Sequence, residues 1–396
     1  MVEALAKHPD AEMVAVCDAS EHQRRECRAL AERNGLDLVF YDDFDRFIEH
    51  DMDAVVLANY ATEHAPYAVR LLDSGRHVCS EVLACETMAE GVALVEAVER
   101  SGKAYTYAEN YCYAAGIFEM QRLYQVGALG EFLHGECEYI HDCESIWPLI
   151  THGEKDHWRV WTPSTFYCTH SAGPIMSITG LRPTRVTGYE TPNVNSRRFG
   201  RLGSDGSLLV CQMSNGGIAK FVPWAGYRKG HGANWCAVYG SKGSAEIDRW
   251  GGDVHVYTEE KGETETYRPE PPDISELAKS IAGHGGGDFY TMQFFLDAAL
   301  DRPGKENAID VYQAVDMTAL GILGYRSIWE RNIPLEVPDL RDKAVREKYR
   351  DDNWCVDPKF AGPGQPDCST SFGPVEIDES VYEETAEKYR ESLPKG

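Results

Sequence analysis

The first 110 residues alternate short apolar runs with helical segments, and this alternation constrains the fold more than any other feature of the chain. The apolar runs lie at residues 12–17, 37–40, 53–59, 77–81 and 104–108. The capping signals of the helices between them are Ser20, Gly35, the Thr87/Glu90 pair and Gly102. Strands that alternate with helices in this way are typical of βαβ units and a parallel sheet covered on both faces. The sequence therefore predicts a Rossmann-like α/β domain.

Asp18 ends the first apolar run and is followed by a helix. Dinucleotide-binding folds hold the adenosine ribose with an acidic residue at this point, although a turn residue or helix cap is an equal alternative. The matching Gly-x-Gly-x-x-Gly turn would lie about 20 residues upstream, at or before Met1. Because the first strand is central in this fold, we expect either a longer natural protein or a rebuilt sheet, and we favour the first.

From about residue 131 the chain becomes rich in strands. Strand-like runs lie at residues 133–141, 184–189, 207–213, 218–222, 234–239, 245–248 and 254–258. Few helices separate them, which favours a large open, mostly antiparallel sheet. Helices are expected at residues 288–300, 311–329 and 379–391. We therefore expect three parts: the Rossmann-like domain at 1–110 without its first strand, an α+β substrate and oligomerisation domain at 111–340, and an extended arm with a terminal helix at 341–396.

Charge and composition exclude several classes of function. The formal net charge of −25 repels phosphate backbones and anionic lipid, so no nucleic-acid or membrane partner is expected. The chain contains no apolar run long enough to span a bilayer. Its 12 cysteines include no Cys-x-x-Cys pair, so we interpret most of them as reduced, buried side chains of a cytoplasmic protein and expect no metal site. The expected ligands are small molecules.

Two motifs of the first domain resemble those of the Gfo/Idh/MocA oxidoreductases. These are Asn59-Tyr-Ala-Thr-Glu-His64 after a buried strand and the segment from Gly75 to Glu81. Most members carry Glu-Lys-Pro at the second motif, where the lysine is the catalytic acid/base. This chain instead reads Glu81-Val82-Leu83, which departs from lysine-based alcohol oxidation.

Further motifs resemble the NAD-dependent glycosidases of glycoside hydrolase family 109, the α-N-acetylgalactosaminidase type. They are Glu109-Asn110-x-x-Tyr113, Tyr139-Ile-His-Asp142, His157-Trp-Arg159, Tyr167-Cys-Thr-His170, Gly283-His-Gly-Gly286 and Asp310-Val-Tyr312. The resemblance implies NAD as the cofactor and a glycoside as the substrate. It also implies a mechanism in which C3 of the sugar is oxidised, C2 is deprotonated, the aglycone is eliminated, and water and hydride then return.

The resemblance assigns roles to particular residues. Tyr139 is the expected C2 base and His170 the group that carries the C3 hydroxyl proton, with Tyr167 and Arg159 as further catalytic residues. The expected cofactor-binding residues are Asp18, Asn59, Thr62, His64, Glu81, Val82, Asn110 and Tyr167. The expected substrate-binding residues are Tyr139, Arg159, Tyr167, Thr169, His170 and Tyr227. The segment at Gly283 is interpreted as a tight turn.

Alternatives stay open at this point. Tyr139 can be a core tyrosine, His170 a structural histidine and Arg159 half of a salt bridge. A plain NAD(P)-dependent sugar dehydrogenase, with His170 in place of the missing lysine, would accumulate NADH, whereas a hydrolase needs only catalytic NAD. A cofactor-free, non-catalytic relative would bind no NAD. The sequence names neither the sugar nor the anomer, and we expect a homo-oligomer formed through the open sheet.

Overall fold

The computed structural model describes residues 2–224, 226–229, 231–273, 275–281 and 283–393. Its N-terminal part contains α1 (Val2–Lys7), β1 (Ala15–Cys17), α2 (Glu21–Asn34), β2 (Val39–Tyr41), α3 (Phe44–Phe47), β3 (Ala54–Leu57), α4 (His64–Asp73), β4 (His77–Ser80), α5 (Met88–Ser101) and β5 (Tyr105–Tyr107). As predicted, Ser20 and Gly35 cap α2, and Thr87 and Gly102 cap α5.

The strands of this part form two parallel sheets rather than one. One sheet is β1–β2 and the other is β3–β4–β5, and the described residues place no strand between them. Both sheets nevertheless run parallel, as the alternation of strands and helices predicted. Their carboxyl ends carry Asp18, the turn after Leu57, Glu81 and the Glu109-Asn110 segment.

The second part is built on a nine-stranded, mostly antiparallel open sheet, confirming the predicted fold class. Its strands are β6 (Phe132–Ile140), β7 (Pro183–Glu190), β8 (Ser207–Met213), β9 (Ile218–Trp224), β10 (Asn234–Gly240), β11 (Gly243–Ile247), β12 (Val254–Thr258), β13 (Thr264–Tyr267) and β14 (Leu335–Glu336), in the order β13-β12-β11-β10-β6-β9-β8-β7-β14. Within this sheet, only the β6–β9 pair of the described strands is parallel. The sequence predicted β6 to β12 and missed the short edge strands β13 and β14.

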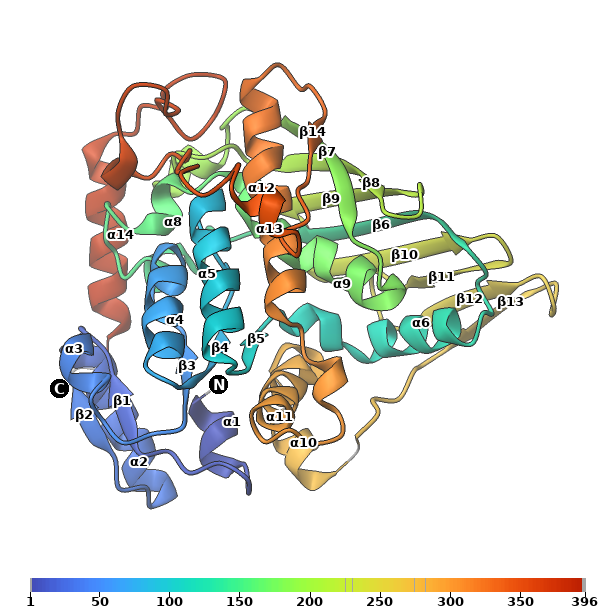
Figure 1. Ribbon diagram of the computed structural model, residues 1–396. Helices are drawn as coiled ribbons and strands as arrows, with labels where there is room; N and C mark the ends of the chain where they lie inside the picture. Colours follow the sequence, from blue (N-terminus) through green and yellow to red (C-terminus); the bar gives the residue numbers. More distant parts are fainter. Residues whose placement is uncertain (1, 225, 230, 274, 282, 394–396) are drawn as a thin grey trace.

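Helices cover one face of this sheet (Figure 1). They are α6 (Ala115–Gln125), α9 (Thr169–Thr179) and α12 (Val311–Trp329), of which the sequence predicted only α12. Glycines bring α12 close to the sheet: a Cβ on Gly188 of β7 would lie 2.2 Å from the carbonyl oxygen of Gly324. No described helix is long and apolar enough to cross a membrane.

One pair of cysteines departs from the expectation of reduced thiols. Cys137 of β6 and Cys236 of β10 are direct partners across the antiparallel ladder, and the structure joins them in a disulfide. Ten further cysteines are free thiols, and most of these are buried. Sequence spacing could not find this pair, because the two residues lie 99 positions apart and meet only through strand register.

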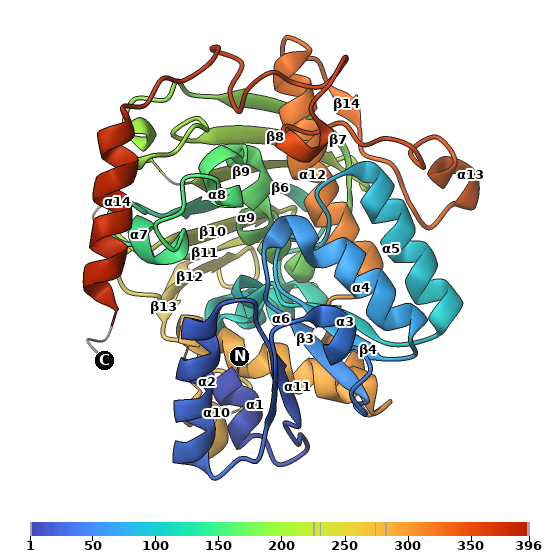
Figure 2. The same cartoon turned by 90° about the vertical axis from the view of Figure 1, so that its left-hand side faces the viewer.

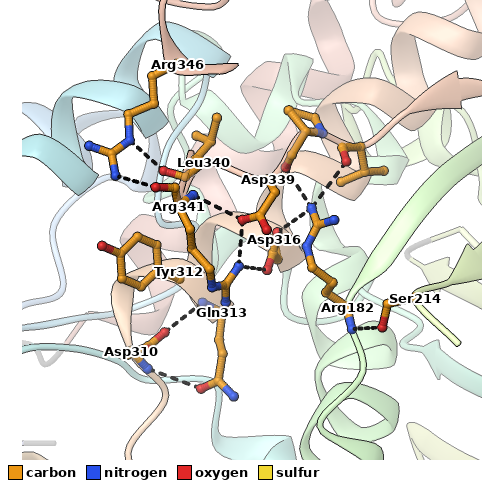
Figure 3. A network of polar contacts seen from close by, with 12 residues as sticks. Arg182, Ser214, Asp310, Tyr312, Gln313, Asp316, Asp339, Leu340, Arg341 and Arg346 are labelled. Carbon is orange, nitrogen blue, oxygen red and sulfur yellow. Dashed lines mark hydrogen bonds and ion pairs between the residues drawn. The ribbon is translucent and has the colours of Figure 1, made fainter. Parts of the chain in front are cut away.

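The C-terminal segment is tied to the body of the protein by ion pairs. Figure 3 shows the first of these anchors, where buried Asp316 of α12 lies between two arginines. Arg182 lies 3.0 Å and Arg341 2.9 Å from its carboxylate. Helix α14 (Glu379–Ser392) ends the segment and lies beside α7 (Trp147–Ile150), as Figure 2 shows. The helix predicted at 379–391 is therefore present.

Candidate active site

The side chains of Tyr139 and His170 meet beside the carboxyl ends of the first domain's strands. Tyr139 lies near the end of β6, and His170 lies in the first turn of α9. Their rings are 4.4 Å apart in an edge-to-face arrangement. Tyr111, in the short helix Asn110–Tyr113, packs against both, at 4.9 Å from His170 and 5.3 Å from Tyr139. The structure thus brings together two predicted catalytic residues from distant parts of the sequence.

His170 is held by a buried carboxylate. Its Nδ1 lies 2.7 Å from Oε1 of Glu109, whose side chain is completely buried. A carboxylate at Nδ1 selects the tautomer in which Nδ1 carries the hydrogen, so Nε2 is free to accept a proton. The other oxygen of Glu109 has no hydrogen-bond partner among the described residues. This arrangement makes His170 suited to act as a base rather than a passive core residue.

Arg159 extends the cluster. It lies in the one-turn helix α8 (Trp158–Trp161), where its guanidinium sits over the Trp158 ring at 4.3 Å and donates a hydrogen bond to the Tyr167 hydroxyl. Tyr167 in turn lies 5.5 Å from the His170 ring. Burial raises the pKa of Tyr167, and the charge of Arg159 lowers it. The guanidinium therefore places positive charge beside the Tyr167 phenol.

Tyr139 is protonated at neutral pH in this environment. Burial raises its pKa well above the usual value, and Tyr111 and Tyr167 raise it further. Among the causes of the shift, Arg159 acts in the opposite direction and favours the phenolate. A tyrosine in such a site can serve as a base only through a minor ionised population, and that population grows with pH.

Glu81 and Asn110 border the same cluster from the first domain. Burial raises the pKa of Glu81, while the charge of His170 lowers it. Asn110 donates a hydrogen bond of 3.0 Å to Asp288, but its buried Oδ1 has no partner among the described residues. A buried amide oxygen without a donor suits the N–H groups of a bound ligand such as a nicotinamide carboxamide. Val82 is almost buried beside Glu81.

The turn after β3 is fixed from within by His64. Its ring nitrogens contact the carbonyl oxygens of Asn59, at 3.1 Å, and Leu83, at 2.8 Å. Burial lowers the pKa of this imidazole to about 4, so it is neutral at physiological pH. His64 was expected beside the nicotinamide, and the structure places it as a buried bridge between the two loops that follow β3 and β4. Asn59 is exposed and Thr62 is buried.

Asp18 follows β1 and precedes α2. Its Oδ1 accepts the Ser20 amide hydrogen at 2.7 Å, as an N-terminal turn residue does. Its charge also contributes to raising the pKa of Tyr60, whose hydroxyl donates to Glu154 at 2.8 Å. The bond to Ser20 fits the interpretation of Asp18 as a turn residue before α2.

Thr169 and Tyr227 are the two remaining residues predicted to bind substrate. Thr169 is completely buried at the start of α9, with no hydrogen-bond partner for its hydroxyl among the described residues. Tyr227 packs closely against Gly206, where an added Cβ would lie 2.3 Å from its ring. The other predicted catalytic residues, Tyr139, Tyr167, Arg159 and His170, are joined by ring contacts and by the hydrogen bond from Arg159 to Tyr167.

Other residues of the cluster were not selected from the sequence. Glu109 stood in a quoted motif without a role, and Tyr111 follows it. His284 was interpreted as part of a tight turn without carboxylate partners, but its Nδ1 lies 3.0 Å from Asp288 and its ring 6.0 Å from Tyr111. The spacing of four residues between His284 and Asp288, at the start of a helix, is a sequence pattern that could have indicated this ion pair. No group of three metal-ligating side chains lies among the described residues.

Two family models match separate parts of this chain. Residues 1–109 match the oxidoreductase family with an NAD-binding Rossmann fold, and residues 256–346 match the C-terminal domain of glycosyl hydrolase 109. A glycosyl hydrolase family 109 protein of Porphyromonas gingivalis is 25% identical over 85% of this chain and 81% of its own length. An alpha-N-acetylgalactosaminidase of Shewanella oneidensis is 24% identical over 83% and 79%, respectively.

Solved structures of low sequence identity share the fold. The aldose-aldose oxidoreductase of Caulobacter crescentus, complexed with glycerol, has a TM-score of 0.67 at 18% identity and covers 85% of this chain and 94% of its own. Levoglucosan dehydrogenase in complex with NADH has a TM-score of 0.65 at 16% identity, over 85% and 96% of the two chains. These similarities support the overall architecture.

Proposed function

We propose that this chain, which joins a Gfo/Idh/MocA-type Rossmann domain to a C-terminal domain of glycosyl hydrolase family 109 and is a distant homologue of that family, is an NAD-dependent glycoside hydrolase. The observation that carries the proposal is the convergence of Tyr139, Arg159 and the Glu109–His170 pair at one end of the Rossmann strands. These groups match a reaction that needs two separate proton acceptors and a cation.

The residues that follow β3, β4 and β5 fit the nicotinamide end of NAD. The unpartnered oxygen of Asn110 can accept from the carboxamide, and the turn from Asn59 to Thr62 with Glu81 and Val82 would border the ring. Asp18 would hold the adenosine ribose, as acidic residues at this point of the fold do. When bound, NAD accepts a hydride from the sugar and later returns it.

His170 would handle the proton of the C3 hydroxyl. Because Glu109 binds Nδ1, the lone pair of Nε2 can take this proton as the C3 carbon loses its hydride. When the hydride returns, the same nitrogen would give the proton back. This role replaces the lysine that Gfo/Idh/MocA oxidoreductases carry where this chain has Val82.

Tyr139 would remove the proton from C2 after the oxidation. The ketone at C3 makes this proton acidic, and the electron pair left on C2 expels the aglycone from C1. Arg159 supports this step twice, because it favours the phenolate of Tyr139 and can donate to an enolate oxygen. Water then adds at C1 and a proton returns to C2, which reverses the elimination with water in place of the aglycone.

A sugar dehydrogenase is the second candidate, and the Glu109–His170 pair favours it equally, since alcohol oxidation needs only this base. One assay separates the two. Enzyme with one equivalent of NAD⁺ is given a chromogenic glycoside, and aglycone and NADH absorbance are followed together. Many turnovers of aglycone per NAD⁺ support the hydrolase, whereas conversion of the single equivalent of NAD⁺ to NADH with no aglycone, followed by further NADH only when more NAD⁺ is added, would establish the dehydrogenase. Failure of the protein to bind NAD would support a cofactor-free relative.

The uncovered face of the nine-stranded sheet is the proposed surface for self-association. Tyr257, Tyr239 and Ile218 lie in one cross-strand row on this face and are 41%, 41% and 52% exposed. Ser244 and His134 lie between them in the same row, so three large apolar side chains are exposed in a mixed row. We propose that a second copy of the chain covers them.

A further inference from the structure

The C-terminal arm reaches the loops that follow β3 and β4. Residues 347–396 lie beyond both segments matched by family models. The arm nevertheless inserts Lys359, from the short helix Pro358–Phe360, between the turn after β3 and the loop after β4. These are the two loops that carry the residues expected to border the nicotinamide.

Lys359 makes three contacts there. Its Nζ lies 2.6 Å from Oε2 of Glu86, 3.3 Å from the carbonyl oxygen of Thr62 and 3.0 Å from Oδ2 of Asp357. The Glu86 side chain is completely buried, whereas Lys359 remains partly exposed. One ammonium group therefore joins the Thr62 turn, the Glu86 loop and the arm itself.

The same two loops are joined on the inside by His64. Its ring contacts the carbonyl oxygens of Asn59 and Leu83. His64 and Lys359 thus connect the turn 59–64 to the segment 81–86 at two points, one from within the Rossmann domain and one from the arm. A turn held at two points has little freedom to tilt, whereas a single contact would permit rotation.

Helix α14 of the arm supports this turn from another side. The backbone of Ala386 packs so closely on Gly153 that an added Cβ there would lie 2.8 Å from it. The Tyr389 ring lies 5.8 Å from His152. Glu154 of the same segment accepts the hydrogen bond from the Tyr60 hydroxyl, inside the turn. Two separate parts of the arm therefore support residues 59–64: Lys359 directly, and α14 through residues 152–154.

We propose that Lys359 is a positioning residue for the cofactor: it fixes the Asn59–His64 turn and the Glu81–Glu86 loop in the relative geometry that receives the nicotinamide. This inference rests on the proposed use of NAD. The arm would then contribute to the geometry of the cofactor site.

A structural ion pair is the competing explanation, and a double variant separates the two. Lys359→Met removes the ammonium but also leaves Glu86 buried without its partner, which destabilises the fold. Glu86→Gln combined with Lys359→Met removes that unpaired charge, yet Thr62 still lacks its donor. Arg350→Gln is the matched control. Arg350 belongs to the same arm and forms a 2.7 Å ion pair with Glu96, and this ion pair contacts neither loop.

Three measurements are made on each full-length variant: thermal midpoint, the dissociation constant for NAD⁺ by calorimetry, and hydrogen exchange of peptides covering 59–64 and 81–86. The double variant should recover most of the midpoint lost by Lys359→Met, but both should bind NAD⁺ about tenfold more weakly, with faster exchange in the two peptides. Lys359→Arg should restore binding. Arg350→Gln should stay within about twofold of wild type.

Recovery of NAD⁺ affinity together with stability in the double variant would overturn the positioning role and leave a structural ion pair. Unchanged exchange at 59–64 in Lys359→Met would do the same. A wild-type protein that binds no NAD⁺ would overturn the proposed function and, with it, the cofactor role of Lys359. Normal binding by wild type and by Lys359→Met would overturn only the inference about the arm.

Discussion

The Nδ1 atom of His170 lies 2.7 Å from Oε1 of Glu109, a carboxylate with no exposed surface. This pair joins the start of α9 to the segment after β5, so it connects the substrate domain to the Rossmann domain. The contact decides which imidazole nitrogen can accept a proton. Under the proposed function, His170 of α9 would supply the base that Gfo/Idh/MocA oxidoreductases take from a lysine where this chain has Val82.

Substitution of His170 by alanine should lower turnover by about 10²–10⁴-fold and leave NAD⁺ affinity nearly unchanged, since general bases contribute on this scale. Glu109→Gln should also lower turnover, because an amide can donate to Nδ1 and select the wrong tautomer. Steady-state kinetics and NAD⁺ calorimetry check both variants, with exposed Glu131→Gln as a control. A loss below about threefold in His170→Ala would make the histidine structural.

The rate of C2 deprotonation should rise with pH. The pKa of Tyr139 is raised by burial, so its phenolate is scarce at neutral pH and increases up to tenfold per pH unit below that pKa. Exchange of the C2 hydrogen in deuterated buffer measures this step between pH 6 and 9. Arg159→Met removes the charge that favours the phenolate and should move the rise to higher pH. An exchange rate independent of pH would exclude Tyr139 as the base.

Acid should destabilise the protein in the range set by His64. Its pKa is about 4 in the folded state, because of burial, and about 6.5 when unfolded, so the unfolded chain binds more protons between these values. The free energy of unfolding should therefore fall as pH drops from 6.5 to 4, with about 3 kcal/mol from this group. Urea titrations of wild type and His64→Asn test this, and the variant should show a shallower dependence. Equal slopes would show that His64 is not the source.

Local patterns in the sequence predicted most of the fold. The Ser20 and Thr87 caps and the apolar runs located the parallel strands because short-range chemistry determines them. The edge strands β13 and β14 were missed because each has few residues and depends on its neighbour for pairing. The Cys137–Cys236 pair depends on register between distant strands and had no local signal.

Only those residues of the candidate site that lie in recognisable motifs could be predicted from the sequence. Tyr139, Arg159, Tyr167 and His170 were selected by resemblance, and the structure brings them together. Glu109 contacts His170, which lies 61 positions away in the sequence. Lys359 contacts Glu86, which lies 273 positions away. Sequence spacing cannot reveal such pairs, because tertiary folding alone makes them neighbours.

Charge placed on the open face of the sheet should separate the proposed oligomer. Ile218 is 52% exposed and lies in the row with Tyr239, so Ile218→Lys would place a cation within the self-association surface. Light scattering should give a multiple of 44.3 kDa for wild type and the monomer mass for the variant. Val126→Lys is the control, because Val126 is 66% exposed but follows α6 on the helical side. A monomeric wild type would contradict the proposal.

Tyr139→Phe tests the central claim most directly, because it removes one hydroxyl and preserves the ring that packs on His170. With NAD⁺ and a glycoside in deuterated water, wild type should release aglycone and exchange the C2 hydrogen. The variant should oxidise bound glycoside once, show NADH absorbance, and neither exchange at C2 nor release aglycone. Aglycone release by the variant at the wild-type rate would contradict the account.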